Sequence, residues 1–264
     1  DDTLNIYTGR LPRISLVLLN LNDTGVPFFQ DIEVRKALLL GTNRNAIISE
    51  MFNGQAIVAN GVILPGTWAY NDSLPTVGYD PKLAAETLKN AGYLVTGEEN
   101  PVRTKDDVQL SFVFSYPDDD LHQSIAQMLA DDWKELGIDV TLEGVPPDVF
   151  VAEKLEPRAY QAALVDLNLS RTPDPDPYPF WDLGQAESGQ NYSQWNNRLA
   201  SDSIEQARVT IDLAERTRLY HNFQAIFAEE VPAIPLYYPV YNYGVSEQIL
   251  GVTMGPLFDT SDRL

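Results

Sequence analysis

The middle of the sequence alternates between strand-like and helix-like patterns, and this alternation constrains the fold most. Two runs with apolar residues at alternate positions, Leu110–Tyr116 and Ile138–Leu142, flank a segment whose apolar residues follow helical spacing. A short helical segment that begins at two prolines then leads to a third strand-like run, Ala162–Leu169. Parallel neighbouring strands need a crossover long enough to hold a helix. The pattern therefore predicts an α/β fold with a sheet covered by helices.

Capping residues and apolar spacing predict further helices on both sides of this region. Asp80 is placed to cap a helix that Pro81 begins and that ends before Gly92. Four more helices are expected from their apolar spacing: Asp31–Leu40, Asn43–Asn53, Asp202–Val209 and Asp212–Glu230. Residues 55–79 have glycine and proline punctuation without a helical period, which predicts a long ordered loop.

Composition narrows the classes of partner. The 264 residues include 38 acidic and 18 basic side chains, and the net charge of −20 opposes binding to nucleic acid or to an anionic membrane. The chain has no cysteine, which excludes both a disulfide framework and a thiolate site. No apolar run approaches the roughly 18 to 20 residues of a membrane helix. The N-terminal residues have no basic start followed by an apolar core, so any signal peptide is expected to lie upstream.

A candidate ligand site follows the third strand-like run. The strand leads into the sequence RTPDPDPYPFW, in which the prolines lack amide donors and restrict the movement of charged and aromatic neighbours. Ligands of open α/β sheets usually bind at strand ends. The candidate ligand-binding residues are Asn168, Ser170, Arg171, Asp174, Tyr178 and Trp181. The alternative interpretation is a rigid surface connection with solvated carboxylates.

The residues that usually carry catalysis are absent or poorly spaced. His122 and His221 lie in predicted helices without a second histidine at metal-binding spacing, so surface or capping roles are expected. No nucleophile elbow, phosphate loop or dinucleotide fingerprint occurs. Asp174 and Asp176 lack the third oxygen ligand and the glycine of a calcium loop. We therefore expect neither catalysis nor a metal at this loop, and no motif calls for a cofactor.

Several longer stretches, taken together and in order, resemble one protein family. They are VRKALLLGTNRNAIISEMFNGQAIVANGVILPG, YDPKLAAETLKNAGY, IAQMLADDWKELGIDVTLEGV, DPDPYPFW, NYSQWNN and ERTRLYHNFQAIFAEEVPAIPLYYP. The resemblance is to the family 5 extracellular solute-binding proteins, the peptide and nickel binders of bacterial ABC importers. It covers residues 14–245 in a single collinear order.

The resemblance implies a type II periplasmic-binding fold, in which two lobes joined by crossing strands enclose a solute. This chain resembles the C-terminal lobe, a mixed sheet flanked by helices. Residues 1–24 are expected to enter the lobe as a crossover strand, residues 25–231 to form the ligand-binding lobe, and residues 232–264 to hold the return strand and a truncated tail. Ile14–Asn20 and Ile234–Tyr238 are therefore predicted to lie side by side.

The resemblance also bears on the solute and its partners. In the peptide binders an aspartate shortly before the Asp-Pro element pairs with the amino terminus of the peptide, and Ser170 and Arg171 occupy that region here. A cation does not pair with an ammonium group, so this departure from the family favours a carboxylate-bearing or sugar-like solute over an ordinary peptide. The expected partner is an ABC permease, and the expected state is a monomeric receptor in the periplasm or a lipoprotein at the cell surface. The alternative is an extracytoplasmic or regulatory sensor that uses the same lobe.

Overall fold

The computed structural model describes residues 4–95, 101–169 and 174–253. Its strands are β1 Leu4–Arg10, β2 Arg13–Leu19, β3 Ala56–Val58, β4 Leu94–Val95, β5 Arg103–Lys105, β6 Val108–Gln109, β7 Ser111–Pro117, β8 Asp139–Val145, β9 Ala162–Asn168 and β10 Ala233–Ser246. Its α-helices are α1 Ile32–Leu40, α2 Arg44–Phe52, α3 Pro81–Asn90, α4 Asp120–Glu135, α5 Tyr178–Trp181, α6 Arg198–Val209 and α7 Leu213–Glu230. Short 3-10 turns, η1 Pro27–Gln30 and η3 Leu183–Gln185, and a π-helical turn, η2 Val151–Leu155, complete the set.

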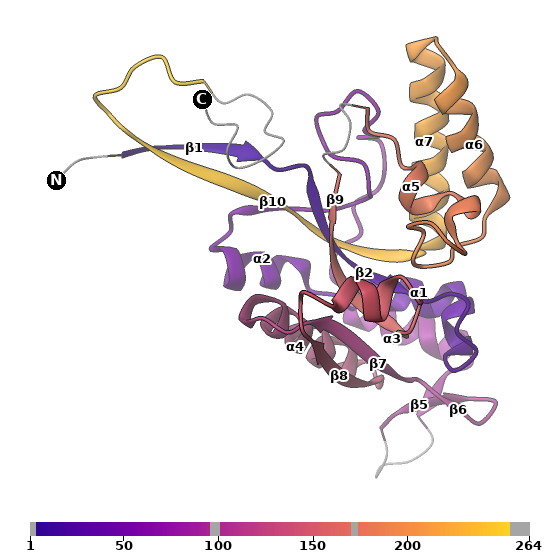
Figure 1. Cartoon of the computed structure of the whole chain (residues 1–264). Helices are drawn as coiled ribbons and strands as arrows, with labels where there is room; N and C mark the ends of the chain where they lie inside the picture. The colour runs from indigo at the N-terminus through magenta and orange to yellow at the C-terminus, as the bar shows by residue number, and fades with distance from the viewer. Residues whose placement is uncertain (1–3, 96–100, 170–173, 254–264) are drawn as a thin grey trace.

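The main sheet is mixed, with the strand order β1-β10-β2-β9-β7-β8 and with β3 beside β10 (Figure 1). β7 runs parallel to β8 and β9, whereas β2 runs antiparallel to both β9 and β10. The crossover from β7 to β8 contains α4, as the alternating pattern predicts. Trp133 of α4 packs against Phe112 and Phe114 of β7, at ring-centroid distances of 5.8 and 5.5 Å. The expected α/β class with a mixed sheet flanked by helices is therefore confirmed.

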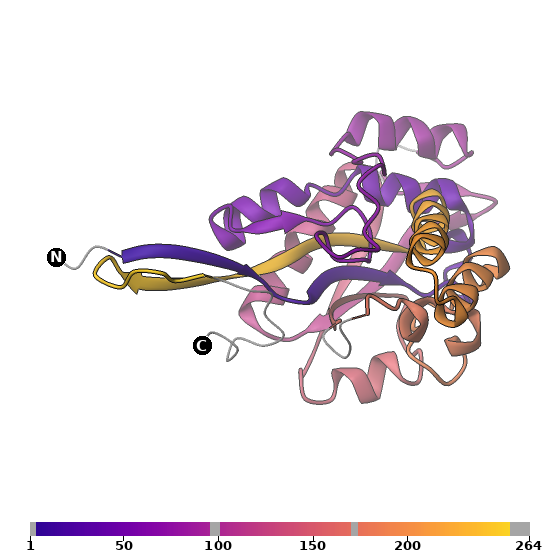
Figure 2. The same cartoon turned by 90° about the horizontal axis from the view of Figure 1, so that it is seen from above.

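β10 is the strand that links the sheet to a ribbon beyond it. Its first part pairs with β2, with Ala233 opposite Leu18 and Ile234 opposite Val17. The prediction that Ile14–Asn20 and Ile234–Tyr238 lie side by side is thus confirmed. The second part of β10 pairs with β1 and extends away from the helices as a two-stranded ribbon (Figures 1 and 2).

Capping residues define the helix ends as expected. The Asp80 carboxylate accepts a hydrogen bond from the Leu83 amide at 2.8 Å at the start of α3, and Gly92 follows that helix with a φ of +92°. At the start of α7 the Asp212 carboxylate accepts from the Glu215 amide at 2.8 Å. The four other helices predicted from apolar spacing correspond to α1, α2, α6 and α7. α6 begins at Arg198, earlier than predicted, because Asn197 caps it.

The structure corrects two expectations and adds one helical turn. Residues 55–79 contain β3, which is too short for a periodic signal and forms because Tyr237 and Tyr238 of β10 pair with it. The helix expected after the two prolines before Asp148 is a π-helical turn. The proline-rich loop also contains the helical turn α5, because Pro179 lies in its first turn, where no intrahelical donor is needed.

Candidate functional site

The carboxyl ends of the parallel strands β7, β8 and β9 lie at one edge of the main sheet. We call this the β9 edge; it comprises the last residues of β9, the first turn of α4, and the loop of residues 174–178. Asp166 and Asn168 are the exposed residues at the end of β9. In α/β sheets this edge is where ligands bind, because the strand ends leave a crevice lined by loops and helix starts.

His122 joins α4 to β9 at this edge. Its Nδ1 lies 2.6 Å from Oδ2 of Asp119, the residue that caps α4, and its Nε2 lies 3.4 Å from Oδ2 of Asp166. Burial alone lowers the pKa of His122, but the hydrogen bonds and charges of Asp166 and Asp119 outweigh it and raise the pKa. Burial raises the pKa of Asp119, but the hydrogen bonds from His122 outweigh burial and lower this pKa. The imidazole of His122 between two carboxylates therefore links the helix start to the strand end.

A row of polar side chains continues from this link into the sheet. Ser15 of β2 lies opposite both Asp166 of β9 and Tyr237 of β10, so the three residues are neighbours across adjacent strands. Ser15 and Tyr237 are buried. Burial, with a smaller contribution from the charge of Asp166, raises the pKa of Tyr237, which keeps the phenol neutral. Among the described residues, no group of three or more histidine, cysteine, aspartate or glutamate side chains is arranged to hold a metal ion.

The loop of residues 174–178 forms a second cluster, with the α6–α7 hairpin. Arg216 of α7 pairs with Asp174 at 2.5 Å, and Arg208 of α6 pairs with Asp176 at 3.1 Å. The guanidinium of Arg208 also lies over the ring of Tyr178, 4.0 Å from its centroid. The hydrogen bond to Asp174 raises the pKa of Arg216, and burial raises the pKa of Asp176.

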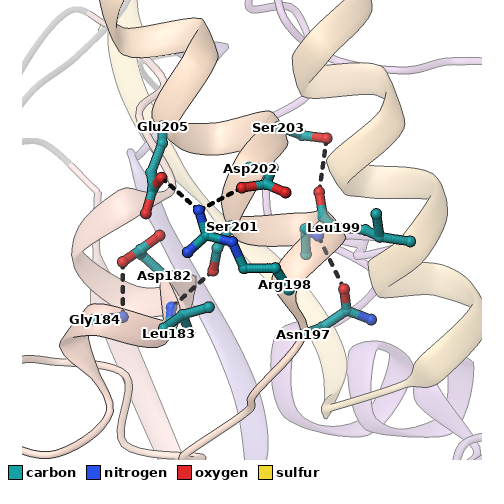
Figure 3. A network of polar contacts seen from close by, with 11 residues as sticks. Asp182, Leu183, Gly184, Asn197, Arg198, Leu199, Ser201, Asp202, Ser203 and Glu205 are labelled. Carbon is teal, nitrogen blue, oxygen red and sulfur yellow. Dashed lines mark hydrogen bonds and ion pairs between the residues drawn. The ribbon is translucent and has the colours of Figure 1, made fainter.

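The segment after the loop is fastened to the start of α6 (Figure 3). The Asp182 carboxylate accepts a hydrogen bond from the Gly184 amide, and the Leu183 amide donates to Oγ of Ser201, both at 2.8 Å. Arg198 pairs with Asp202 at 2.6 Å on the exposed side of the helix. The 174–178 loop and the segment of residues 182–184 that follows it are thus both bound to the α6–α7 hairpin.

The described site candidates lie on different elements of the structure. Asn168 ends β9, opposite Arg13 of β2. Asp174 and Tyr178 belong to the loop cluster. Trp181 is 2% exposed and packs edge-on against Phe227 at 4.8 Å, so it belongs to the core beneath the loop.

Two further predicted site residues, Ser170 and Arg171, lie outside the described residues. The expectation that Asn168, Ser170, Arg171, Asp174 and Tyr178 border one groove stays a prediction.

Four residues of this region were not predicted as site residues from the sequence: His122, Asp166, Arg208 and Arg216. Asp166 carried a usable signal, because it is a charged residue inside an otherwise apolar run. The two arginines carried none, because their partners on the loop are distant in sequence.

Comparison with known proteins identifies the family to which this chain belongs. The model of the bacterial extracellular solute-binding proteins, family 5, middle region, matches residues 1–190. The chain belongs to the family 5 bacterial extracellular solute-binding proteins. It is 25% identical to the dipeptide-binding protein of Escherichia coli over 263 residues, which cover 97% of this chain and 46% of that protein. It is 28% identical to di/tripeptide-binding protein 2 of Pseudomonas aeruginosa over 243 residues, 87% of this chain and 41% of that protein.

Solved structures of the family share the fold. The oligopeptide-binding protein AppA of Bacillus subtilis, in complex with a nonapeptide, superposes with a TM-score of 0.85 at 25% identity, over 98% of this chain and 51% of AppA. NikZ of Campylobacter jejuni, in complex with Ni(L-His), superposes with a TM-score of 0.80 at 24% identity, over 97% of this chain and 51% of NikZ. The chain spans about half the length of these relatives. Within the part of the chain that the structure describes, no helix has the length and apolar character needed to cross a membrane.

Proposed function

We propose that this chain is one ligand-binding lobe of a receptor that captures a small solute for an ABC importer. The observation that carries the proposal is the course of β10, which pairs with β2 inside the sheet and then with β1 in the ribbon beyond it. A strand shared in this way suits a connection between two lobes that close on a solute. The division into an entering strand, residues 1–24, a lobe, residues 25–231, and a return segment, residues 232–264, is part of this proposal.

The solute binds at the β9 edge, between this lobe and a second one. The relatives include proteins named for dipeptides, tripeptides and oligopeptides, which supports a solute of peptide size. Arg171 in the sequence just after β9 favours a solute with a carboxylate or with sugar-like hydroxyls. The receptor works outside the cytoplasm as a monomer, in the periplasm or as a lipoprotein, delivers its solute to a membrane permease and does no chemistry on it.

Native mass spectrometry of the complete natural protein tests this proposal. Purified without denaturation, it is expected to retain a small molecule, which denaturation releases unchanged. If the protein instead releases a mixture of hydrolysis products, and the amount of these products increases with protein concentration, the protein is an enzyme. A protein that carries no solute and shows no thermal shift with peptides, sugars or organic acids contradicts solute capture.

Replacing Arg171 with alanine tests the solute class. If a charge-assisted hydrogen bond reaches an anionic solute, affinity falls by about 1.5 to 3 kcal/mol. Titration calorimetry with the solute identified by mass spectrometry measures this change, and Arg171→Lys is expected to recover part of it. Equal affinities of all three proteins contradict a role for this side chain in recognition.

A further inference from the structure

We infer that Arg208 and Arg216 are positioning residues, which hold the loop of residues 174–178 in place at the β9 edge. The inference rests on the proposed function, because it gives this loop a role in the solute site. Neither arginine is itself required to touch the solute. Each acts through a carboxylate or a ring of the loop.

The loop needs side-chain anchors because its sequence weakens backbone anchoring. Pro175 and Pro177 have no amide hydrogen to donate to a neighbouring segment. The Asp176 amide donates to the Asp174 carbonyl at 2.8 Å, and the Tyr178 amide donates to the Asp176 carboxylate at 3.1 Å. These bonds fix the local shape of the loop but do not attach it to the rest of the molecule.

The attachment comes from two arginines on two different helices. Arg216 of α7 donates to the Asp174 carboxylate and lies 4.9 Å from the ring centroid of Trp68, in the loop of residues 59–79. Arg208 of α6 pairs with Asp176 and stacks over Tyr178. Each guanidinium therefore combines an ion pair with an aromatic face, and its planar shape suits both contacts.

The Arg216 pair is less exposed than the Arg218–Glu215 pair of the same hairpin, and the Arg208 side chain, at 46% exposed, lies between the two. The side chain of Arg216 is 19% exposed, whereas that of Arg218, which pairs with Glu215 one turn away on α7, is 57% exposed. Exposed pairs within one helix contribute little because water screens them. Arg216 instead bridges from α7 to a loop 42 residues earlier in the chain. Tyr220 beneath the pair is buried, and burial together with the charges of Asp176 and Asp174 raises its pKa to about 12.

As a consequence, the loop, the α6–α7 hairpin and Trp68 are expected to move together. The last turn of α6 and the first turn of α7 each hold one end of the loop, so the loop keeps a fixed place relative to β9. Without the two arginines the loop would lose the ion pairs that fasten its carboxylates to α6 and α7.

Hydrogen–deuterium exchange in the 264-residue chain tests the inference. In Arg216→Ala and Arg208→Ala we expect the amides of Asp176, Tyr178 and Trp181 to exchange about tenfold faster or more, since Arg216→Ala loses a charge-assisted hydrogen bond to Asp174 and Arg208→Ala loses the ion pair with Asp176. The matched control is Arg218→Ala, which removes an exposed arginine from the same helix and should leave these amides unchanged. The variants should melt close to the wild-type temperature, and exchange in β2 and β9 should not change.

Arg216→Lys separates positioning from a purely structural role. Lysine keeps the charge but loses the planar fork, so protection of the loop amides should return in part. Exchange rates in both alanine variants equal to wild type, or an equal increase in Arg218→Ala, overturn the inference. A uniform increase over the whole chain in the alanine variants also overturns it, because that result assigns the arginines to overall stability.

A parallel measurement keeps this inference apart from the proposed function. Native mass spectrometry of the complete protein with Arg216→Ala should detect less retained solute than wild type. If the wild-type protein retains none, the proposed function fails, while the exchange rates still decide whether the arginines hold the loop. If the loop loses protection but retention is unchanged, the arginines do not position the solute site, and the inference is wrong.

Discussion

Arginines in the interior and arginines at the β9 edge make different contacts. Arg35 and Arg44 are each 6% exposed, and both donate hydrogen bonds to backbone carbonyls. Arg35 donates to the Glu230 carbonyl at 2.8 Å, at the end of α7, and to the Phe29 carbonyl at 2.7 Å. Arg208 and Arg216 pair with carboxylates of a loop. The same side chain therefore serves two purposes in one molecule.

The difference follows from what each region must satisfy. Helix ends and irregular segments leave carbonyl groups without partners, and burial makes an unpaired carbonyl costly. A guanidinium with several donors can satisfy more than one of them at once. Arg44 does this between α2, the loop of residues 59–79 and β10, where it donates to the carbonyls of Ala59, Val77 and Pro235. Interior arginines thus satisfy buried carbonyls of the fold, whereas the edge arginines pair with carboxylates of a loop.

The largest effect should come from an interior arginine. Arg35→Met keeps the apolar stem but leaves the carbonyls of Phe29, Glu230 and Val231 without their donor, and the expected loss of stability is about 3 to 5 kcal/mol. Urea unfolding followed by circular dichroism measures it. Arg218→Met, on the exposed side of α7, is the matched control and should leave the midpoint in place. If Arg35→Met loses no more stability than this control, the interior arginines do not stabilise the fold more than exposed arginines do.

The second prediction concerns another buried donor, that of Trp133. Its Nε1 donates to the Leu38 carbonyl at 3.2 Å and to Oγ1 of Thr42 at 3.1 Å, which ties α4 to α1. Trp133→Phe removes this donor and leaves a cavity, so stability should fall by about 1 to 3 kcal/mol. Differential scanning calorimetry would report it. Solute retention by the complete protein should be unaffected while the variant stays folded; reduced retention would mean that interior and edge are coupled.

The interior of the fold and the β9 edge were not equally predictable from the sequence. The segment from β7 to β9 was predicted because burial imposes a period on the apolar residues of each element. α3 was predicted from Asp80 and Gly92, because capping is a local interaction. β1 was not predicted as a strand separate from β2, because its apolar alternation is limited to Leu4 and Ile6 and its pairing with β10 is long-range. The small sheet of β4, β5 and β6 was missed because its strands are too short to show a period.

The candidate site was predictable only as a location. The strand end and the prolines indicate where a rigid loop leaves the sheet, and this is a property of the local sequence. Which helix receives the carboxylates of Asp174 and Asp176 depends on how the α6–α7 hairpin packs, and no local pattern encodes that. Trp181 shows the same limit, because an aromatic residue beside a candidate site is equally suited to the core, where the structure places it.

A smaller loss of stability is expected at the turn between α6 and α7, which lies between Arg208 and Arg216. Asp212→Ala removes the cap of α7, which should cost about 1 kcal/mol and fray the first turn. Because Arg216 lies in this first turn, fraying should also expose the amides of the 174–178 loop to exchange. Asp212→Asn, which keeps an acceptor, is the control and should preserve protection. Fraying of α7 without any change in the loop would show that the loop is held independently of the helix start.

The smallest effect is a change of pH dependence at His122, which lies where interior and edge meet. Its pKa is raised in the folded protein, because Asp166 and Asp119 together outweigh the burial that would lower it. A histidine that binds its proton more tightly when folded contributes stability below its unfolded pKa, about 6.5, and loses that contribution as pH rises through the folded value. Urea unfolding of wild type and His122→Gln at pH 5.5, 7 and 8.5 should therefore give a difference in stability that is largest at pH 5.5 and shrinks with rising pH. Asp166→Asn should reduce this dependence without abolishing it, because Asp119 remains 2.6 Å from the other ring nitrogen. A difference that stays constant or grows with pH would mean that His122 is neutral in the folded protein and belongs with the interior residues.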